Sequence, residues 1–166
     1  ALAENKARGA VIDVWENEPD IDIEFLEMVD VATPHIAGYS LDGKVNGMIM
    51  IYEAVCEYFG LEAEFGVDSF LPEPEVPLLE LSVSGDEVQD LLAAVRRVYD
   101  IKEDDRRLKK IADLEPGKRK EYFRRLRKEY PVRREFGNTK VRLAGEEHSL
   151  AERLKATGFE IADERE

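Results

Sequence analysis

The stretch from Ala10 to Pro19, A-V-I-D-V-W-E-N-E-P, opens with a short apolar, β-branched run that is typical of a buried parallel strand. A second run of this kind, residues 29–34, ends at a proline, which cannot donate to a strand ladder. Between the two, residues 22–28 are long enough for one or two helical turns. A strand, a helix and a strand in this order predict the edge of an α/β sheet.

Beyond this sheet edge the apolar residues recur three and four positions apart, which predicts one long helix over residues 40–60. Ser40 suits the N-cap of this helix and Gly60 its C-terminal stop. Because its apolar residues are not confined to one side, we expect the helix to be buried on both. Residues 61–77 follow as an extended linker, since three prolines fall between positions 68 and 77.

The remaining residues, 78–166, predict a small α+β domain, whose modest core would gain from burial against a second copy. Alternating apolar residues mark its strands, and helical spacing marks its helices. In chain order we expect a strand at 79–83, a helix capped by Asp86, a charged helix through Leu108 and Ile111, a helix from Pro116, a strand at 141–143, a short helix capped by Ser149 and a strand at 159–161. The sequence therefore predicts an α/β chain in four parts: 1–39, 40–60, 61–77 and 78–166.

The composition excludes several classes of protein. Of the 166 residues, 43% are apolar and 37% charged, which is typical of a globular chain with a polar surface. A single cysteine, Cys56, excludes an intrachain disulfide framework, and two histidines leave little for a metal site, so we expect no metal. No apolar run is long enough to span a bilayer and no signal peptide is visible. We therefore expect a cytoplasmic protein without a membrane partner.

Charge is distributed unevenly along the chain. Residues 1–95 carry 21 acids and 3 bases, residues 96–142 carry 9 acids and 18 bases, and residues 143–166 carry 7 acids and 3 bases. An acidic front and a basic middle suggest two parts with different roles. Such a basic stretch can bind nucleic acid, but more often it is a solvated helix face or a site of self-association. Because no zinc ligands or known nucleic-acid-binding signature accompany it, we expect no nucleic-acid partner.

Carboxylates within the stretch 13–19 and a histidine, His35, follow the ends of the two predicted strands. In open α/β sheets, ligands bind outside the carboxyl ends of the strands. A carboxylate beside an imidazole fixes the tautomer of the ring and favours its protonated form, so the pair can serve as a general acid and base. From the residues alone, a loop histidine without a role is an equally good interpretation.

Two motifs carry a family resemblance. The run D-V-W-E-N-E-P at 13–19 and the run T-P-H-I-A-G-Y at 33–39 resemble the end of the coenzyme domain of D-isomer-specific 2-hydroxyacid dehydrogenases. The continuation S-L-D-G-K at 40–44 is similar to one member of that family, which has a C-terminal dimerisation domain. Motifs of the second part look like that domain: Val98 to Ile101, Asp104-Asp105, Leu126 to Lys128 and Arg133 to Phe136.

The resemblance implies roles for five residues. His35 would be the acid/base that takes the proton of a 2-hydroxyl group as hydride leaves for NAD, and Glu18 would be its carboxylate partner. Asp13 and Gly38 match cofactor-binding positions, and Tyr39 matches a substrate-binding position. The fold implied is the C-terminal remnant of a Rossmann-type coenzyme domain with a helix returning to the substrate domain, followed by a small α+β dimerisation domain.

The implied reaction is the oxidation of 4-phospho-D-erythronate by NAD in pyridoxal phosphate biosynthesis, by a homodimer. Asn46 departs from the family pattern, where an arginine is expected. The chain contains no Gly-x-Gly-x-x-Gly fingerprint for the pyrophosphate, and Arg8-Gly9 lies too close to Asp13 to supply the substrate-binding arginine. We therefore expect a fragment of the enzyme that is inactive by itself. The alternative is a free-standing self-association module with vestigial catalytic residues.

Overall fold

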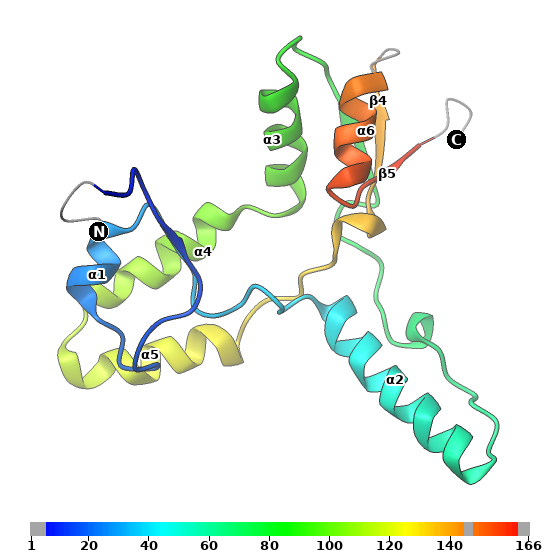
Figure 1. Ribbon diagram of the computed structural model, residues 1–166, viewed down its shortest axis with the longest axis horizontal. Helices are drawn as coiled ribbons and strands as arrows, with labels where there is room; N and C mark the ends of the chain where they lie inside the picture. The colour runs from blue at the N-terminus through cyan, green and yellow to red at the C-terminus, as the bar shows by residue number, and fades with distance from the viewer. Residues whose placement is uncertain (1–5, 145–147, 163–166) are drawn as a thin grey trace. The chain divides into compact units, whose positions relative to one another are not determined.

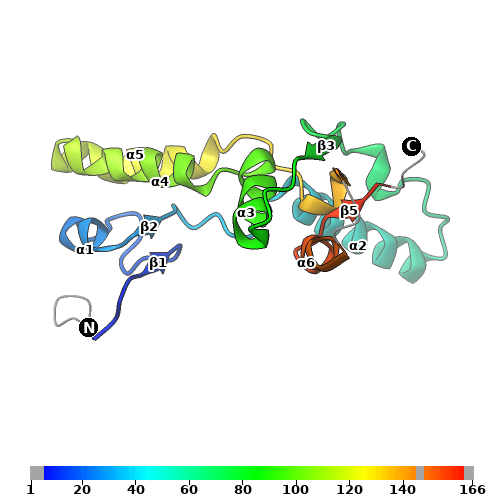
Figure 2. The ribbon, with the colours of Figure 1, turned by 90° about the horizontal axis from the view of Figure 1, so that it is seen from above.

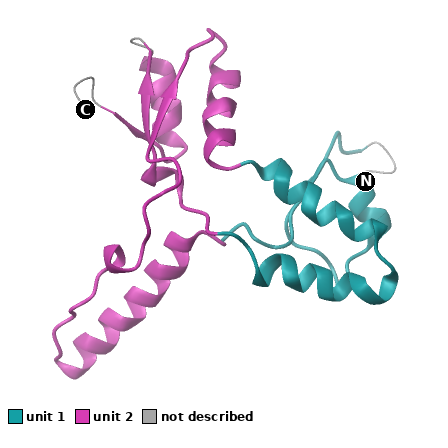
Figure 3. Ribbon diagram, turned by 180° about the vertical axis from the view of Figure 1, so that it is seen from behind, with its two compact units in different colours: residues 1–38, 100–131 teal, residues 39–99, 132–166 magenta. Residues whose placement is uncertain are grey.

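The structure, a computed structural model, describes residues 6–144 and 148–162 (Figure 1). Its contacts group the chain into two compact units (Figure 3). Unit 1 combines Ala1–Gly38 with Asp100–Pro131, and unit 2 combines Tyr39–Tyr99 with Val132–Glu166. Both units contain helices and a small parallel sheet, so the predicted α/β class is confirmed in this general form.

Unit 1 combines the predicted strand–helix–strand segment with helices that come much later in the chain. Its elements are β1 (Val11–Ile12), α1 (Ile23–Met28), β2 (Val31–Ala32), α4 (Ile101–Lys109), the 3-10 helix η2 (Lys110–Asp113) and α5 (Pro116–Lys128). β1 and β2 pair in parallel, with Val11 opposite Val31. The Asp22 side chain caps α1 by accepting a hydrogen bond from the Phe25 N–H (3.2 Å). Each strand is shorter than predicted because, in the described chain, it pairs only with the other.

The hydrophobic core of unit 1 joins its two chain segments. Trp15 and Leu26 pack in one buried cluster with Leu108 of α4 and Phe123 of α5. α5 turns Phe123 inward while basic side chains on its other side, such as Lys128, are exposed. The basic stretch therefore includes a solvated face on an amphipathic helix, one of the interpretations that the charge distribution allowed.

Unit 2 contains a three-stranded parallel sheet in the order β3-β4-β5 (Figure 2). Its elements are α2 (Leu41–Phe59), the 3-10 helix η1 (Val67–Ser69), β3 (Leu78–Leu81), α3 (Glu87–Val98), the 3-10 helix η3 (Phe136–Asn138), β4 (Lys140–Leu143), α6 (His148–Ala156) and β5 (Glu160–Ile161). The sheet shares its core with α3 and α6 through Leu79, Ala94, Val141 and Leu154. One predicted cap is wrong, because α6 begins at His148 and Ser149 lies inside its first turn.

Helix α2 has the predicted ends but not the predicted burial. The Ser40 hydroxyl accepts a hydrogen bond from the Gly43 N–H (3.0 Å), and Gly60 ends the helix with a left-handed φ of 65°. The expectation that the helix is buried on both sides is wrong for the described chain, in which Ile51 is 70% exposed and Tyr58 82% exposed. Apolar residues surround much of this helix, and the described part of unit 2 covers only some of them.

The four parts predicted from the sequence (1–39, 40–60, 61–77 and 78–166) are consecutive stretches of the chain. The two units of the structure are defined by contacts instead, and each combines two separate stretches. Residues 70–77 contain no helix or strand, and the extended linker over 61–77 stays a prediction. Residues 100–131, placed by position in the last part, contribute to the core of unit 1. The four positional limits stay a prediction.

Substitution Phe123→Ala tests whether the two segments of unit 1 share one core. Loss of this fully buried ring should lower the free energy of unfolding by about 3–5 kcal/mol. Trp15, the only tryptophan, lies in the same cluster, so its fluorescence should report the loss as an unfolding midpoint at lower urea concentration. Leu154→Ala in the core of unit 2 is the matched control and should leave the Trp15 transition in place. An unchanged transition in Phe123→Ala would contradict a shared core.

Candidate functional site

Glu18 and His35 form a hydrogen-bonded pair in unit 1. The distance from His35 Nδ1 to Glu18 Oε2 is 2.9 Å, and the other carboxylate oxygen accepts from the Trp15 N–H at 2.8 Å. The Glu18 side chain is 18% exposed and that of His35 is 44% exposed. The carboxylate is therefore held by the backbone on one side and by the ring on the other, while the ring stays accessible to solvent.

Asp13 organises the loop that carries His35. Its Oδ1 accepts hydrogen bonds from the Thr33 hydroxyl (2.6 Å) and the Ile36 N–H (2.8 Å), and its Oδ2 accepts from the Ala37 N–H (3.1 Å). These donors lie on both sides of His35, whose φ of 57° is uncommon for a residue with a side chain. The Asp13 carboxylate at the end of β1 thus compensates for the unfavourable turn at the histidine.

Trp15 gives the loop a second anchor, and it is not among the residues predicted from the sequence. Its indole Nε1–H donates to the buried carbonyl of Thr33 at 2.8 Å. The ring is 5% exposed and meets the Phe25 ring edge-on, with centroids 5.8 Å apart. A buried tryptophan needs a partner for its N–H, so the tryptophan within the D-V-W-E motif was the signal that could have indicated this anchor.

The other residues singled out in the sequence are placed as follows. Gly38 is exposed, and nothing lies within 4 Å of where its Cβ would be. Tyr39 is the first residue of unit 2, and the ammonium group of Lys44 lies 4.1 Å from the centre of its ring. The structure thus brings Asp13, Glu18 and His35 together in unit 1. It shows open space at Gly38 and a cation–π contact at Tyr39.

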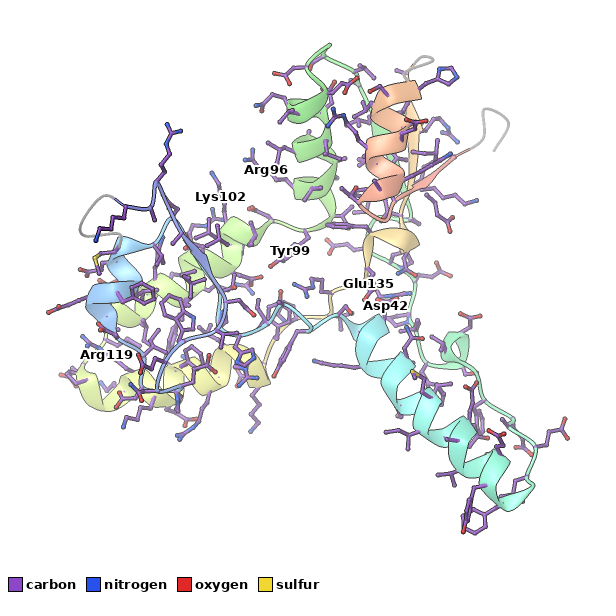
Figure 4. All side chains as sticks on the ribbon, in the orientation of Figure 1. Asp42, Arg96, Tyr99, Lys102, Arg119 and Glu135 are labelled. Atoms are coloured by element: carbon purple, nitrogen blue, oxygen red, sulfur yellow. The ribbon has the colours of Figure 1, made fainter. Side chains whose placement is uncertain are left out.

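A buried ion pair between Asp42 and Arg134 fixes the start of α2, just after Tyr39. Figure 4 labels Asp42 at the start of this helix, with Glu135 beside it. Asp42 lies within 3.1 Å of the Arg134 guanidinium, and its oxygens also accept from the Glu135 N–H (3.0 Å) and the Asn138 side-chain amide (2.8 Å). Burial by itself raises the pKa of Asp42, but these hydrogen bonds, that of Arg134 foremost, outweigh it and hold the pKa below its ordinary value.

The lowered pKa predicts acid sensitivity of unit 2. The unfolded chain binds a proton at Asp42 more readily than the folded chain does. This stabilisation is therefore complete above about pH 4, the ordinary pKa of an aspartate, and is lost as pH falls through the lower folded value. Urea unfolding followed by circular dichroism should show the loss in the parent protein and a smaller loss in Asp42→Asn. Glu73→Gln, which removes an exposed carboxylate of the same unit, should behave like the parent. An equal acid dependence in all three proteins would contradict the role of Asp42.

A cavity of about 240 Å³ lies in unit 1 beside Pro34, the residue before His35. Its polar lining residues include two arginines, two carboxylates and two tyrosines: Arg107, Arg125, Asp104, Glu129, Tyr122 and Tyr130. The two positive charges are balanced by the two negative ones, so the lining charges favour neither an anion nor a cation.

Among residues 6–144 and 148–162, no three His, Cys, Asp or Glu side chains lie close enough together to hold a metal ion. Over the same ranges, none of the helices has the length and hydropathy needed to cross a membrane.

The fold and the site together define an α/β chain with a carboxylate–histidine pair at the carboxyl ends of adjacent parallel strands. A protein-family model described as a domain of unknown function (DUF3410) matches residues 70–158, more than half of the chain. The chain belongs to this family.

Curated relatives identify the particular enzyme that the sequence motifs resemble. The chain is 43% identical over 160 residues to the erythronate-4-phosphate dehydrogenase of Marinobacter nauticus, covering 96% of this chain and 42% of the relative. Identity to the proteins of the same name is 41% over 160 residues in Proteus mirabilis (96% and 40%) and 40% over 149 residues in Pseudomonas putida (90% and 39%). The chain spans about two fifths of the length of these relatives, and its resemblance to the C-terminal part of that enzyme is confirmed.

Proposed function

We propose that the chain is the C-terminal part of a cytoplasmic, NAD-dependent dehydrogenase that oxidises 4-phospho-D-erythronate in pyridoxal phosphate biosynthesis. The observation that carries this proposal is the hydrogen bond between Glu18 and His35, held at the ends of two parallel strands. The names of the relatives support the substrate. The isolated chain, without a glycine-rich fingerprint, is then inactive.

His35 acts in this proposal as the base. Glu18 accepts the Nδ1–H of the ring, which leaves Nε2 as the nitrogen that exchanges a proton with a ligand. As hydride leaves C2 of the substrate, Nε2 takes the proton of the 2-hydroxyl group, and the product is a 2-oxo acid. The Glu18 carboxylate stabilises the imidazolium that forms and keeps the ring in the tautomer needed for the next turnover.

The residues around the pair fit a nicotinamide cofactor, which supplies the hydride acceptor when it is bound. A carboxylate offers about four acceptor positions, and Asp13 uses three of them on Thr33, Ile36 and Ala37, so one is left for an N–H donor of a ligand. The open space at Gly38 lets a ligand approach the backbone. Tyr39, at the start of unit 2, would contact the substrate.

The architecture supports the remaining parts of the proposal. The parallel β1–α1–β2 segment has the connection expected at the end of a Rossmann-type coenzyme domain. α2 carries exposed apolar residues, as expected of a helix that returns to a substrate domain. The residues after the linker, 78–166, would supply the contacts of a homodimer.

A chimera tests the proposed function: residues 1–166 replace the matching part of the Marinobacter nauticus enzyme, and NAD reduction with 4-phospho-D-erythronate is measured. His35→Asn should lower kcat by about 10²–10⁴-fold, because it removes the base. Glu18→Gln should lower kcat less, because the ring keeps a hydrogen-bonding partner.

Glu16→Gln is the matched control, since Glu16 is an exposed carboxylate of the same loop and should leave kcat unchanged. A folded, dimeric chimera without activity, or one that keeps full activity with Asn at position 35, would contradict the proposal. The first of these results would favour the self-association module with vestigial catalytic residues.

A further inference from the structure

Asp105 of α4 bonds directly to the strand that leads to His35. Its Oδ1 accepts a hydrogen bond from the Ala32 N–H at 2.8 Å, across 73 positions of the sequence. One helical turn later, Lys109 pairs with the same oxygen at 2.9 Å and donates to the carbonyls of Val29 and Asp30, both at 3.3 Å. α4 therefore contacts β2, and the side chains of Asp105 and Lys109 fix it to this strand and to the residues just before it.

The two edges of β2 explain why this bond matters. The N–H groups of Val31 and Thr33 point toward β1 and donate to the carbonyls of Ala10 (3.3 Å) and Ile12 (2.9 Å). The Ala32 N–H points to the opposite edge, and Ala32 is fully buried. A buried N–H without a partner costs about 1–3 kcal/mol. The Asp105 carboxylate thus takes the place that a neighbouring strand would have at this edge.

The held strand continues directly into the loop of the histidine. The residue after Ala32 is Thr33, whose hydroxyl donates to Asp13 and whose carbonyl accepts from Trp15. His35 follows two residues later, with its left-handed φ. A shift of β2 would therefore move the Thr33 contacts and the ring that they position.

We propose that Asp105 is a positioning residue for the Glu18–His35 pair, acting through the backbone N–H of Ala32. The inference rests on the proposed function and deepens it. It gives helix α4, which lies within the matched family domain, a part in the catalytic site: the helix orders the strand from which the base projects.

Kinetics of the chimeric enzyme test the inference. Asp105→Ala should lower kcat by about 10- to 100-fold, because a displaced base is poorly aligned with the reacting bond, with little change in the KM for NAD. Asp105→Asn keeps an oxygen that can accept from Ala32 and should recover most of kcat. Glu103→Ala is the matched control on the same helix, since Glu103 pairs only with Arg106 and Arg107 in the contacts described, and it should leave kcat unchanged.

Amide hydrogen exchange in the 166-residue chain provides a second readout that does not depend on activity. Asp105→Ala should speed exchange at Ile36 and Ala37, the two amides bonded to Asp13, and Asp105→Asn should restore protection. Val141 in the sheet of unit 2 should exchange at the parent rate in both variants.

The inference would be overturned if Asp105→Ala kept the wild-type kcat, or if the kcat of Asp105→Asn were no higher than that of Asp105→Ala. The proposed function would still be supported in either case, provided that His35→Asn lowers kcat. Full activity of His35→Asn would overturn the proposed function, and the exchange rates at residues 36 and 37 would still decide whether Asp105 orders the loop. A merely structural role would lower the urea midpoint of Asp105→Ala but leave the kcat of the folded enzyme and the two exchange rates unchanged.

Discussion

A parallel pair of two-residue strands cannot bury its own apolar side chains, and this constraint governs unit 1. A sheet of two strands needs packing against another element to be stable. Here that element is the α4–α5 segment, which places Leu108 and Phe123 against Trp15 and satisfies the Ala32 N–H through Asp105. The histidine loop leaves this sheet directly after Ala32, so it begins at the strand that the α4–α5 segment contacts.

The same arrangement changes how the matched family domain is understood. The match covers residues 70–158, yet residues 100–131 from within it share a unit with Glu18 and His35. A domain considered only by its limits along the chain would look separate from the segment that carries Glu18 and His35. The contacts make part of it a support for that segment, and unit 2 shows the same principle at Asp42 and Arg134, which join the start of α2 to the segment before β4.

Several local features follow from the sequence with a clear physical reason. Ser40 and Gly60 determine the ends of α2, because a hydroxyl accepts the free N–H groups of a first turn and glycine adopts a left-handed φ at low cost. The order strand–helix–strand and the rule that ligands bind at carboxyl ends of strands pointed to a carboxylate and a histidine, and the family resemblance then singled out Glu18 and His35. The hydrogen bond between them is present in the structure, and their catalytic role stays a proposal.

The sequence by itself thus determined the limits of α2, the α/β class, the resemblance to one enzyme and the two residues of the pair, since each depends on short-range patterns or motifs. Only the tertiary structure decided that Asp105 bonds to Ala32, that Asp42 pairs with Arg134 and that α2 is largely exposed in the described chain. A periodic pattern shows that a face is apolar or that a carboxylate is present, but it does not specify the partner. Residues 73 and 92 positions apart meet only when the whole unit has packed.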